Sequence, residues 1–496
     1  LVAIKNGDAW NLLSEPRQRI VEDKLLNAEL AGVGLDGEDL KKFNDIAREL
    51  SKLSTEFSNH VLDATKAWSL TVTDPADTEG WPESLKQLTA QAHNQAKAEE
   101  EPEATPEGGP WRVSLEGPVV QPFLQHSRNR QQREQAFRAY LTRASSGEWD
   151  NTEIINRTLK LRKQKAALLG YENFAALSLA KKMAPGVDAV LKLSEELRAA
   201  AWDAAVQDLE DLKQLAAESG ETDDIKHWDI AFWAERLREQ KFNYTDEQLR
   251  PYFALPNVLQ GMFDLVQRLF GIVVTAADGE APIWQKDVRY FKISDENGAQ
   301  LAAFYLDPYS RPNDKRGGAW MDDCLGRCVI DGDVQLPVAH LVCNGTPPVG
   351  DRPSLMTFRE VETLFHEFGH ALHGFFADQR YESLSGTAVA RDFVEYPSQV
   401  NEMWATYPEV LSYYAKHYQT GETIPAEIIE KLEASSQFHQ GYDFVYVFFA
   451  SLLDITWAAL SPVLAAALDT PVLVIHFVLH SLSHLGLLTY LSPHRS

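Results

Sequence analysis

The chain has 496 residues, too many for one ordinary hydrophobic core, so two or three subdomains are expected. Hydrophobic residues make up 44% and charged residues 24%, proportions typical of a soluble globular protein. The net charge of −25 argues against a nucleic-acid-binding surface and against docking on an anionic membrane. The same charge is compatible with cationic peptide substrates, although a solubilising acidic surface is an equally good explanation.

The cysteines and the first residues of the chain indicate the cellular compartment. Cys324, Cys328 and Cys343 form an odd, sparse set, which predicts free thiols and a reducing compartment. The chain starts at Leu1 without a charged-then-apolar signal segment, so we expect a processed or truncated N-terminus. No stretch before residue 457 is expected to approach the length of a transmembrane helix. We therefore predict a soluble protein of the cytoplasm or of an organelle matrix or stroma. We also expect the protein to be a monomer.

The first part of the chain is predicted to be helical over residues 15–67, with a cap at Asp36-Gly37. Apolar residues recur every three or four positions from Leu40 to Val61, which predicts one amphipathic helix about 45 Å long with a partner helix. Residues 68–73 and 111–115 alternate in polarity instead, which predicts a short hairpin with a flexible insertion.

The middle of the chain returns to helical periods over residues 120–220, with breaks at Gly147 and at residues 184–186, and again over residues 226–243. Residues 283–308 are predicted to form a hairpin, and residues 338–343 a further strand. A small sheet would thus precede the next helix. An edge strand of such a sheet could pair with a peptide backbone, or the sheet could serve packing alone.

The helix predicted after this sheet contains the candidate metal-binding residues. Residues 359–373 contain His366-Glu367-Phe368-Gly369-His370, an H-E-x-x-H pattern within an apolar helical period. Residues four apart share a helix face, so both imidazoles can point at one ion, and Glu367 is close enough to hold a metal-bound water. Two ligands, a general base and an open fourth position are typical of a zinc peptidase. The alternative is an amphipathic helix whose histidines are surface polar residues.

A tetrahedral zinc needs a third protein ligand. The side chain of His373 starts about 10 Å along the helix axis from that of His366, too far to share an ion. The metzincin pattern requires a third histidine where Phe376 stands, which excludes that family. Residues 392–404 follow a Gly-containing turn and resume a helical period, so a second helix crossing the first can deliver one carboxylate. Besides His373, which its distance excludes, the candidates for the third ligand are Asp378, Glu382, Asp392, Glu395 and Glu402.

Residues 366–373, followed by Phe393-Val394-Glu395-Tyr396-Pro397-Ser398-Gln399, closely resemble the thimet-oligopeptidase family of zinc metallopeptidases. Residues 60–68, 315–323 and 342–344 are similar to that family as well, and the resemblance runs from about residue 10 to about residue 457. It implies Glu395 as the third ligand and Glu367 as the general base. Residues 10–365 resemble oligopeptidase A and its plant organellar relatives, whereas residues 373–442 resemble the peptidyl-dipeptidase branch.

The resemblance implies a mainly α fold, with two helical subdomains flanking a deep channel and a small β-sheet next to the zinc helix. One Zn²⁺ per chain would acidify its water, and Glu367 would take the proton as the water attacks a short peptide. Asp392 or Glu402 would orient a ligand histidine. We predict an N-terminal helical subdomain with a β-hairpin (1–150), a catalytic region (151–456) and an atypical apolar tail (457–496).

The tail departs from the family. Trp457 to Leu491 contains one charged residue, Asp469, which together with Pro471 interrupts any membrane span of about 20 residues. The family has a charged helix there, and then a Gly- and Tyr-rich loop whose tyrosines bind substrate and stabilise the oxyanion; no residue here matches them. The leading prediction is a metalloendopeptidase of short peptides. A peptidyl-dipeptidase and a truncated, catalytically weak zinc- and peptide-binding protein are the alternatives.

Overall fold

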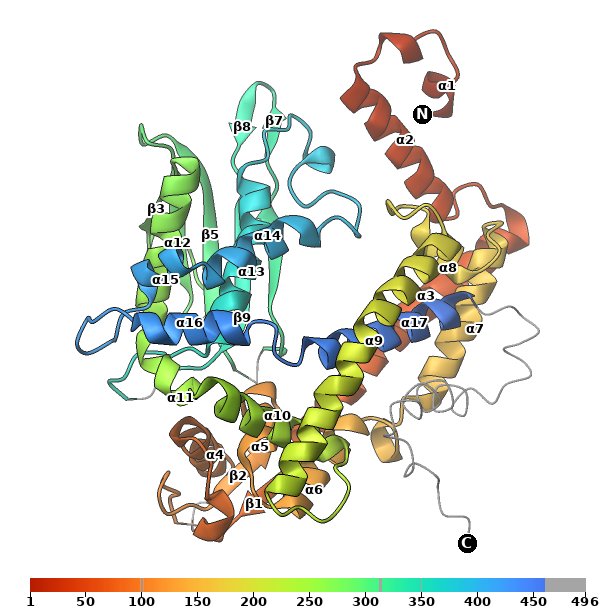
Figure 1. The fold of residues 1–496 in the computed structure, drawn as a ribbon. Coiled ribbons are helices and arrows are strands. Elements are labelled where there is room, and N and C mark those ends of the chain that lie inside the picture. The colour runs from red at the N-terminus through yellow and green to blue at the C-terminus, as the bar shows by residue number, and fades with distance from the viewer. Residues whose placement is uncertain (99, 101, 312–314, 349, 460–496) are drawn as a thin grey trace, which may run out of the picture. The chain divides into compact units, whose positions relative to one another are not determined.

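The chain folds into two compact units (Figure 1). The computed structural model describes residues 1–98, 100, 102–311, 315–348 and 350–459. The first unit comprises Leu1–Leu115, Val119–Leu237 and the segment from Gln437 onward, and the second comprises Glu116–Pro118 and Arg238–Ser436. Helices dominate, so the predicted mainly α fold is confirmed. The predicted domain boundaries and the channel stay predictions, and the tail from residue 460 lies outside the described residues.

The first unit is helical apart from a two-stranded sheet, in which β1 (Ser69–Val72) pairs antiparallel with β2 (Trp111–Ser114). Its main helices are α1 (Val2–Lys5), α2 (Glu15–Leu30), α3 (Gly37–Ala67), α4 (Glu83–Ala96), α5 (Gly117–His126), α6 (Arg130–Leu141), α7 (Thr152–Leu168), α8 (Phe174–Leu179), α9 (Val187–Glu218), α10 (His227–Phe242) and α17 (Gln440–Ala459). Helices α5 and α10 cross the sequence limits of this unit.

The long helix α3 has the predicted start, with Asp36 at its N-cap. A partner helix was predicted without being identified, and the structure shows that it is α7. Arg157 of α7 donates two hydrogen bonds to Glu49 of α3, at 2.5 and 2.7 Å. The predicted strands do pair. They do not form a simple hairpin, however, because α4 lies between them in sequence and packs on β2. Periodicity located both strands but not the helix inserted between them.

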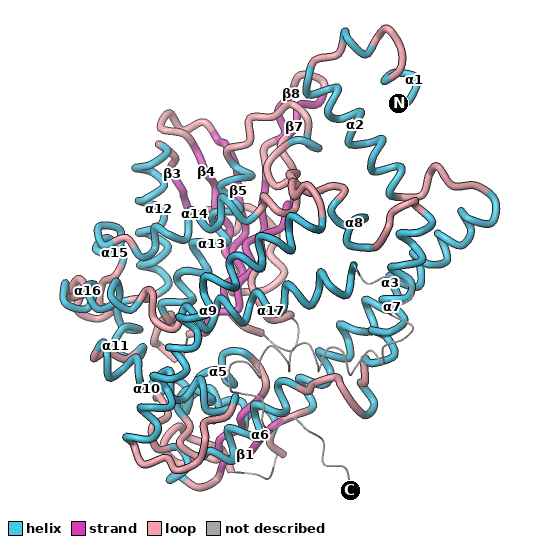
Figure 2. The backbone as a smooth tube through the Cα atoms, turned by 45° about the vertical axis from the view of Figure 1, so that its right-hand side comes forward, coloured by secondary structure: helices cyan, strands magenta, loops and turns pink. Residues whose placement is uncertain are grey.

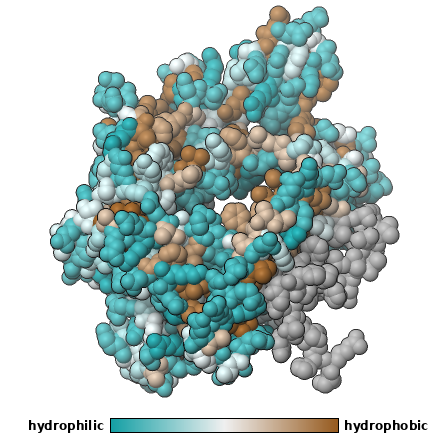
Figure 3. Space-filling model, viewed as in Figure 1, coloured by the Kyte–Doolittle hydropathy of each residue, from teal (hydrophilic) through white to brown (hydrophobic). Residues whose placement is uncertain are grey.

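Helix α17 packs along α9, and its buried side chains Val445 and Phe449 share a hydrophobic cluster with side chains of α9. A Cβ on Gly441 would lie 2.6 Å from the backbone of Ala204, so this glycine permits the close approach of the two helices. By length and composition alone α17 would suffice to span a bilayer, a test that helices of soluble proteins also pass. This corrects the prediction that no stretch before residue 457 approaches that length. Figure 3 shows one face of the molecule, largely hydrophilic with apolar patches.

The second unit is a mixed five-stranded sheet covered by helices (Figure 2). The sheet order is β3 (Val273–Ala276), β4 (Arg289–Ser294), β5 (Gln300–Tyr309), β9 (Val338–Gly345) and β6 (Trp320–Leu325), with β5 and β9 parallel. A separate ribbon pairs β7 (Cys328–Ile330) with β8 (Asp333–Gln335). The helices are α11 (Asp246–Leu249), α12 (Leu255–Phe270), α13 (Phe358–Phe375), α14 (Glu395–Thr406), α15 (Pro408–Tyr414) and α16 (Ala426–Ser435). The predicted hairpin, strand and following helix are all present.

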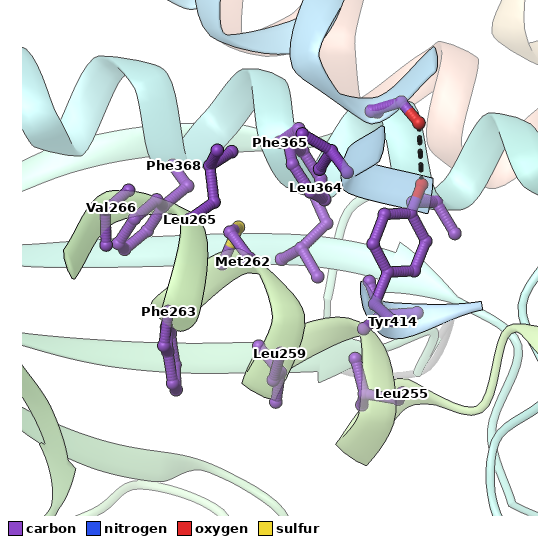
Figure 4. Close-up of a cluster of buried hydrophobic side chains, with 14 of the residues drawn as sticks. Leu255, Leu259, Met262, Phe263, Leu265, Val266, Leu364, Phe365, Phe368 and Tyr414 are labelled. Carbon is purple, nitrogen blue, oxygen red and sulfur yellow. Dashed lines mark hydrogen bonds between the residues drawn. The ribbon is translucent and has the colours of Figure 1, made fainter. Parts of the chain in front are cut away.

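The core of this unit lies between the sheet and helices α12, α13 and α15 (Figure 4). Phe368 of α13 packs edge-on against Phe304 of β5, with ring centroids 5.6 Å apart. Tyr414 is fully buried, and its hydroxyl donates a 2.7 Å hydrogen bond to the carbonyl oxygen of Ala405. The apolar face of α13 is thus fixed on the sheet, which leaves its polar face to carry the histidines.

The edge strand β6 starts from a loop that is held at two points. Lys315 Nζ donates to the buried Asp307 carboxylate at 3.0 Å and to the carbonyl oxygen of Cys343 at 2.6 Å. Asn344 Nδ2 donates to the carbonyl oxygens of Arg316 and Gly318, at 2.7 and 2.6 Å. These bonds join the loop to β5 and β9, so β6 enters the sheet in a fixed register beside β9.

Candidate metal centre

Helix α13 begins with a capping box that also holds the sheet. Thr357 Oγ1 accepts a bond from the Glu360 amide at 3.1 Å, and Glu360 Oε2 accepts one from the Thr357 amide at 2.8 Å. The other oxygen of Glu360 accepts bonds from the amide and the hydroxyl of Thr346, both at 2.8 Å. One carboxylate therefore caps the helix and ties it to the chain that leaves β9.

The structure brings the three predicted metal ligands together. His366 Nε2 and His370 Nε2 lie 3.2 and 3.1 Å from the same oxygen of Glu395, Oε2. The two imidazole centroids are 5.0 Å apart, as expected for neighbours on one helix face. Glu395 is the first residue of α14, so the carboxylate arrives on a second helix, as predicted. His373 is not part of this cluster.

This donor set fits a zinc ion. Ligand atoms about 2.0–2.2 Å from a tetrahedral zinc stand roughly 3.3 Å from one another, close to the separations found here. Imidazole nitrogen and carboxylate oxygen are ligand types that zinc accepts. The side chain of Glu395 is half exposed, so one side of the cluster remains open to solvent. The role of the three residues as ligands stays a prediction.

Glu367 lies beside the cluster in a different environment. Its side chain is buried, and its Oε2 has no hydrogen-bond partner among the described residues. Burial raises the pKa of Glu367 to about 7, because the charged form loses its hydration. A carboxyl group with a pKa near neutrality is suited to accept a proton and to return it.

The sequence predicted that Asp392 or Glu402 orients a ligand histidine, and the structure gives this contact to Glu402. Glu402 Oε2 lies 3.0 Å from His366 Nδ1. This hydrogen bond raises the pKa of His366 and directs Nε2 of the same ring toward Glu395. A carboxylate behind a metal-binding histidine fixes both its tautomer and its orientation.

Loss of this support should weaken metal binding. We expect Glu402→Ala to lower zinc affinity by roughly tenfold or more, because the His366 ring loses the partner that fixes its tautomer. Competition against a chelating dye measures the change. Glu430, an exposed glutamate on α16, provides the matched control Glu430→Ala, which should bind zinc like the unmutated chain. Equal affinities in the two variants would contradict the orienting role.

Sequence reasoning missed how α14 is held against α13. A Cβ on Gly369 would lie 2.7 Å from Asn401 Cβ and 2.8 Å from Ser398 Cα, so only glycine allows the helices to cross this closely. Asn401 Nδ2 donates a 2.6 Å bond to the carbonyl oxygen of Phe365 across the crossing. A glycine inside an apolar helical period was the available signal, since glycine there often marks a close approach.

Filling this space should displace α14. We expect Gly369→Ala to destabilise the protein by roughly 1–3 kcal/mol and to weaken zinc binding, because Glu395 moves with the helix. Gly374→Ala is the matched control on the same helix, where a Cβ would meet its nearest neighbour at 3.7 Å. Thermal unfolding with and without zinc compares the two. A Gly369→Ala chain as stable as Gly374→Ala would show that the crossing is not tight.

Two protein-family models match the chain. The model of peptidase family M3 matches residues 123–463. The model of the neurolysin/thimet oligopeptidase N-terminal domain matches residues 1–40. The first match covers more than half of the chain and includes the whole H-E-x-x-H helix and α14.

Several relatives of this chain are named oligopeptidase A. Organellar oligopeptidase A, chloroplastic/mitochondrial, of Arabidopsis thaliana is 51% identical over 88% of this chain and 56% of its own length. The probable cytosolic oligopeptidase A of the same plant is 50% identical over 88% of this chain and 63% of its own length. Oligopeptidase A of Escherichia coli is 40% identical over the same two shares. The chain thus spans less than two thirds of these relatives. The predicted membership is confirmed, and the chain belongs to peptidase family M3, the family of the thimet oligopeptidases.

Proposed function

We propose that this chain is a zinc metallopeptidase that hydrolyses short peptides. In this proposal His366, His370 and Glu395 hold one Zn²⁺, and Glu367 is the general base. The observation that carries it is the convergence of two imidazole nitrogens on one carboxylate oxygen, beside the buried Glu367, whose Oε2 has no hydrogen-bond partner in the described part of the chain. Membership of family M3 implies a metal cofactor, and the donor set favours zinc.

When bound, zinc supplies a Lewis acid for the scissile carbonyl and lowers the pKa of a water molecule. Glu367 takes the proton from the attacking water, and its raised pKa lets it hand that proton to the leaving amine. Glu402 keeps the His366 ring in place throughout. The chain's own residues thus provide the proton transfer and the orientation of a ligand.

Strand β6 is the proposed support for the substrate backbone. It forms the edge of the sheet beside β9, and it packs against α13, which carries the histidines. An extended peptide can add to such an edge through main-chain hydrogen bonds, which are independent of the peptide's side chains. This mode of binding suits an enzyme of short peptides with varied sequences.

We propose cleavage between internal residues of oligopeptides as the main activity. The name oligopeptidase A of the relatives reported above supports the oligopeptide substrate class. Their names place those proteins in the cytosol or in chloroplasts and mitochondria. For this chain we propose a soluble monomer in a reducing compartment; Cys324, Cys328 and Cys343 are free thiols.

The test combines metal content with product analysis. The purified chain should contain about one zinc per molecule, the count for a single site, and should cleave internally quenched peptides of several lengths. Removal of zinc by a chelator should stop cleavage, and restoring zinc should recover it. Product masses separate internal cleavage from release of C-terminal dipeptides. Zinc retention without any cleavage would overturn the enzyme proposal in favour of a zinc- and peptide-binding protein.

A further inference from the structure

We propose that the connection between α13 and α14, residues 376–394, is a positioning element for the metal centre, and that Asp323 and Arg327 hold it. Both residues belong to the segment of β6 and β7, residues 320–330, and neither is a candidate ligand. The inference rests on the proposed metal site. It assigns to these two residues a role in metal affinity that operates through Glu395.

The connection needs an external support. Its regular structure is limited to one turn of 3₁₀-helix at Glu382–Leu384, and its internal backbone hydrogen bonds are those of single short turns. Connections longer than about 12–15 residues are uncommon in compact domains and usually serve a function. Fixing so many residues costs conformational entropy, which contacts with neighbouring elements must offset.

The start of the connection is held by Arg327. Its Nη1 donates a 2.6 Å bond to the carbonyl oxygen of Gln379, and its Nη2 donates a 2.8 Å bond to the Asp378 carboxylate. The carboxylate is almost fully exposed, so the bond to the carbonyl is the more important of the two. Next to it, the amide of Val329 donates to the carbonyl oxygen of Arg380 at 3.1 Å, which pairs the backbones.

The end of the connection is held by Asp323. Thr387 Oγ1 donates a 2.7 Å bond to Asp323 Oδ2 on β6. The preceding Gly386 has a φ of 53°, and a Cβ there would lie 3.0 Å from Gly374 Cα on α13. The connection is therefore attached to both the edge strand and the last turn of the histidine helix shortly before it reaches Glu395.

Glu395 has one support inside its own helix, because the buried Ser398 donates a 3.1 Å bond to Glu395 Oε2. The attachment of the connection would add a second support, at the start of the helix. As the first residue of α14, Glu395 follows Val394, an N-cap residue whose apolar side chain cannot cap the helix. Helix ends fray where such caps are missing. The helix crossing at Gly369 holds α14 at Ser398 and Asn401, whereas the attachment at Thr387 fixes the chain that leads into its first turn. The same strand, β6, is the proposed support for the substrate, so ligand and substrate would share one anchor.

The experiment measures zinc affinity in the full chain. Thr387→Val removes the hydroxyl at constant shape, and Arg327→Met removes the guanidinium but keeps an apolar stem. We expect the double variant to lose roughly tenfold in zinc affinity, at the lower end of the cost of removing groups that support metal ligands. Thr275→Val on the opposite edge strand, β3, and Arg289→Met on its neighbour β4 should stay within about twofold of the unmutated chain.

Two further readouts separate positioning from a general loss of structure. The cobalt(II)-loaded variant should show altered visible absorption bands, because a displaced Glu395 changes the coordination of the ion. Thr387→Ser should restore the affinity, since serine keeps the donor. If the double variant fails to fold, the isosteric Thr387→Val alone carries the test, with thermal unfolding of the metal-free chains as the check on folding.

The outcomes distinguish this inference from the proposed function. Zinc that is lost in Glu395→Ala but bound normally by the double variant would overturn the inference alone, since the helix crossing would then suffice. An unmutated chain that binds no zinc would overturn both. Weaker binding in the double variant with unchanged controls, together with rescue by serine, would support the positioning role.

Discussion

Replacing Glu367 by glutamine should slow peptide cleavage by orders of magnitude while the chain keeps its zinc. Glutamine has nearly the same shape but cannot take a proton from water, so the loss falls on proton transfer rather than on metal binding. General acid–base catalysis contributes roughly 10²- to 10⁴-fold, and we expect kcat/KM to fall by that order. Steady-state kinetics with quenched peptides, alongside zinc analysis of the same samples, provides the measurement.

Glu362 offers a matched control on the same helix. Burial also raises the pKa of Glu362 to about 7, yet this residue lies one turn before His366 and outside the metal cluster. Glu362→Gln should therefore keep kcat/KM within severalfold of the unmutated chain. If both variants lost activity equally, or if Glu367→Gln retained it, Glu367 would not be the general base.

Replacing Glu395 by alanine should remove zinc from the protein. The variant loses the only carboxylate of the cluster, and we expect its affinity to fall by more than the roughly 10- to 100-fold that loss of a group behind a ligand costs. Cleavage should disappear with the metal. Chelator competition measures the affinity, and unfolding of the metal-free protein should change little because the side chain is half exposed.

A graded series strengthens this test. Zinc affinity should decrease from Glu430→Ala, through Glu402→Ala, to Glu395→Ala, in the order of each residue's distance from the ion in the proposed scheme. If the zinc affinity of Glu395→Ala equalled that of Glu402→Ala, another residue would have to supply the third ligand.

Local patterns in the sequence predicted much of the fold. The apolar period and the Asp36-Gly37 cap gave α3 its correct start, and four-residue spacing placed His366 and His370 on one face. Such features depend on residues close in sequence. Spacing alone left several carboxylates open as the third ligand, and the family resemblance singled out Glu395, which the structure places at the cluster.

Long-range packing could not be predicted in the same way. The parallel pairing of β5 with β9, with β6 outside them, joins strands whose order no local pattern encodes. The close crossing at Gly369 depends on Asn401, far along the chain. Helix α17 was not recognised as one long apolar helix, because Asp443 and Asp454 interrupt its sequence while its packing on α9 is decided by tertiary structure.

Glu360 both caps α13 and binds Thr346 after β9. This double contact divides the metal centre into a rigid part and an adjustable part. Because the Glu360 carboxylate joins the start of α13 to Thr346, strand and helix behave as one preorganised block that carries both imidazoles. Little entropy remains to be lost there when an ion binds. The carboxylate of Glu395 comes from outside this block. Adaptation to a different ion radius or coordination number would therefore fall mainly on Glu395, while the two histidines keep their geometry.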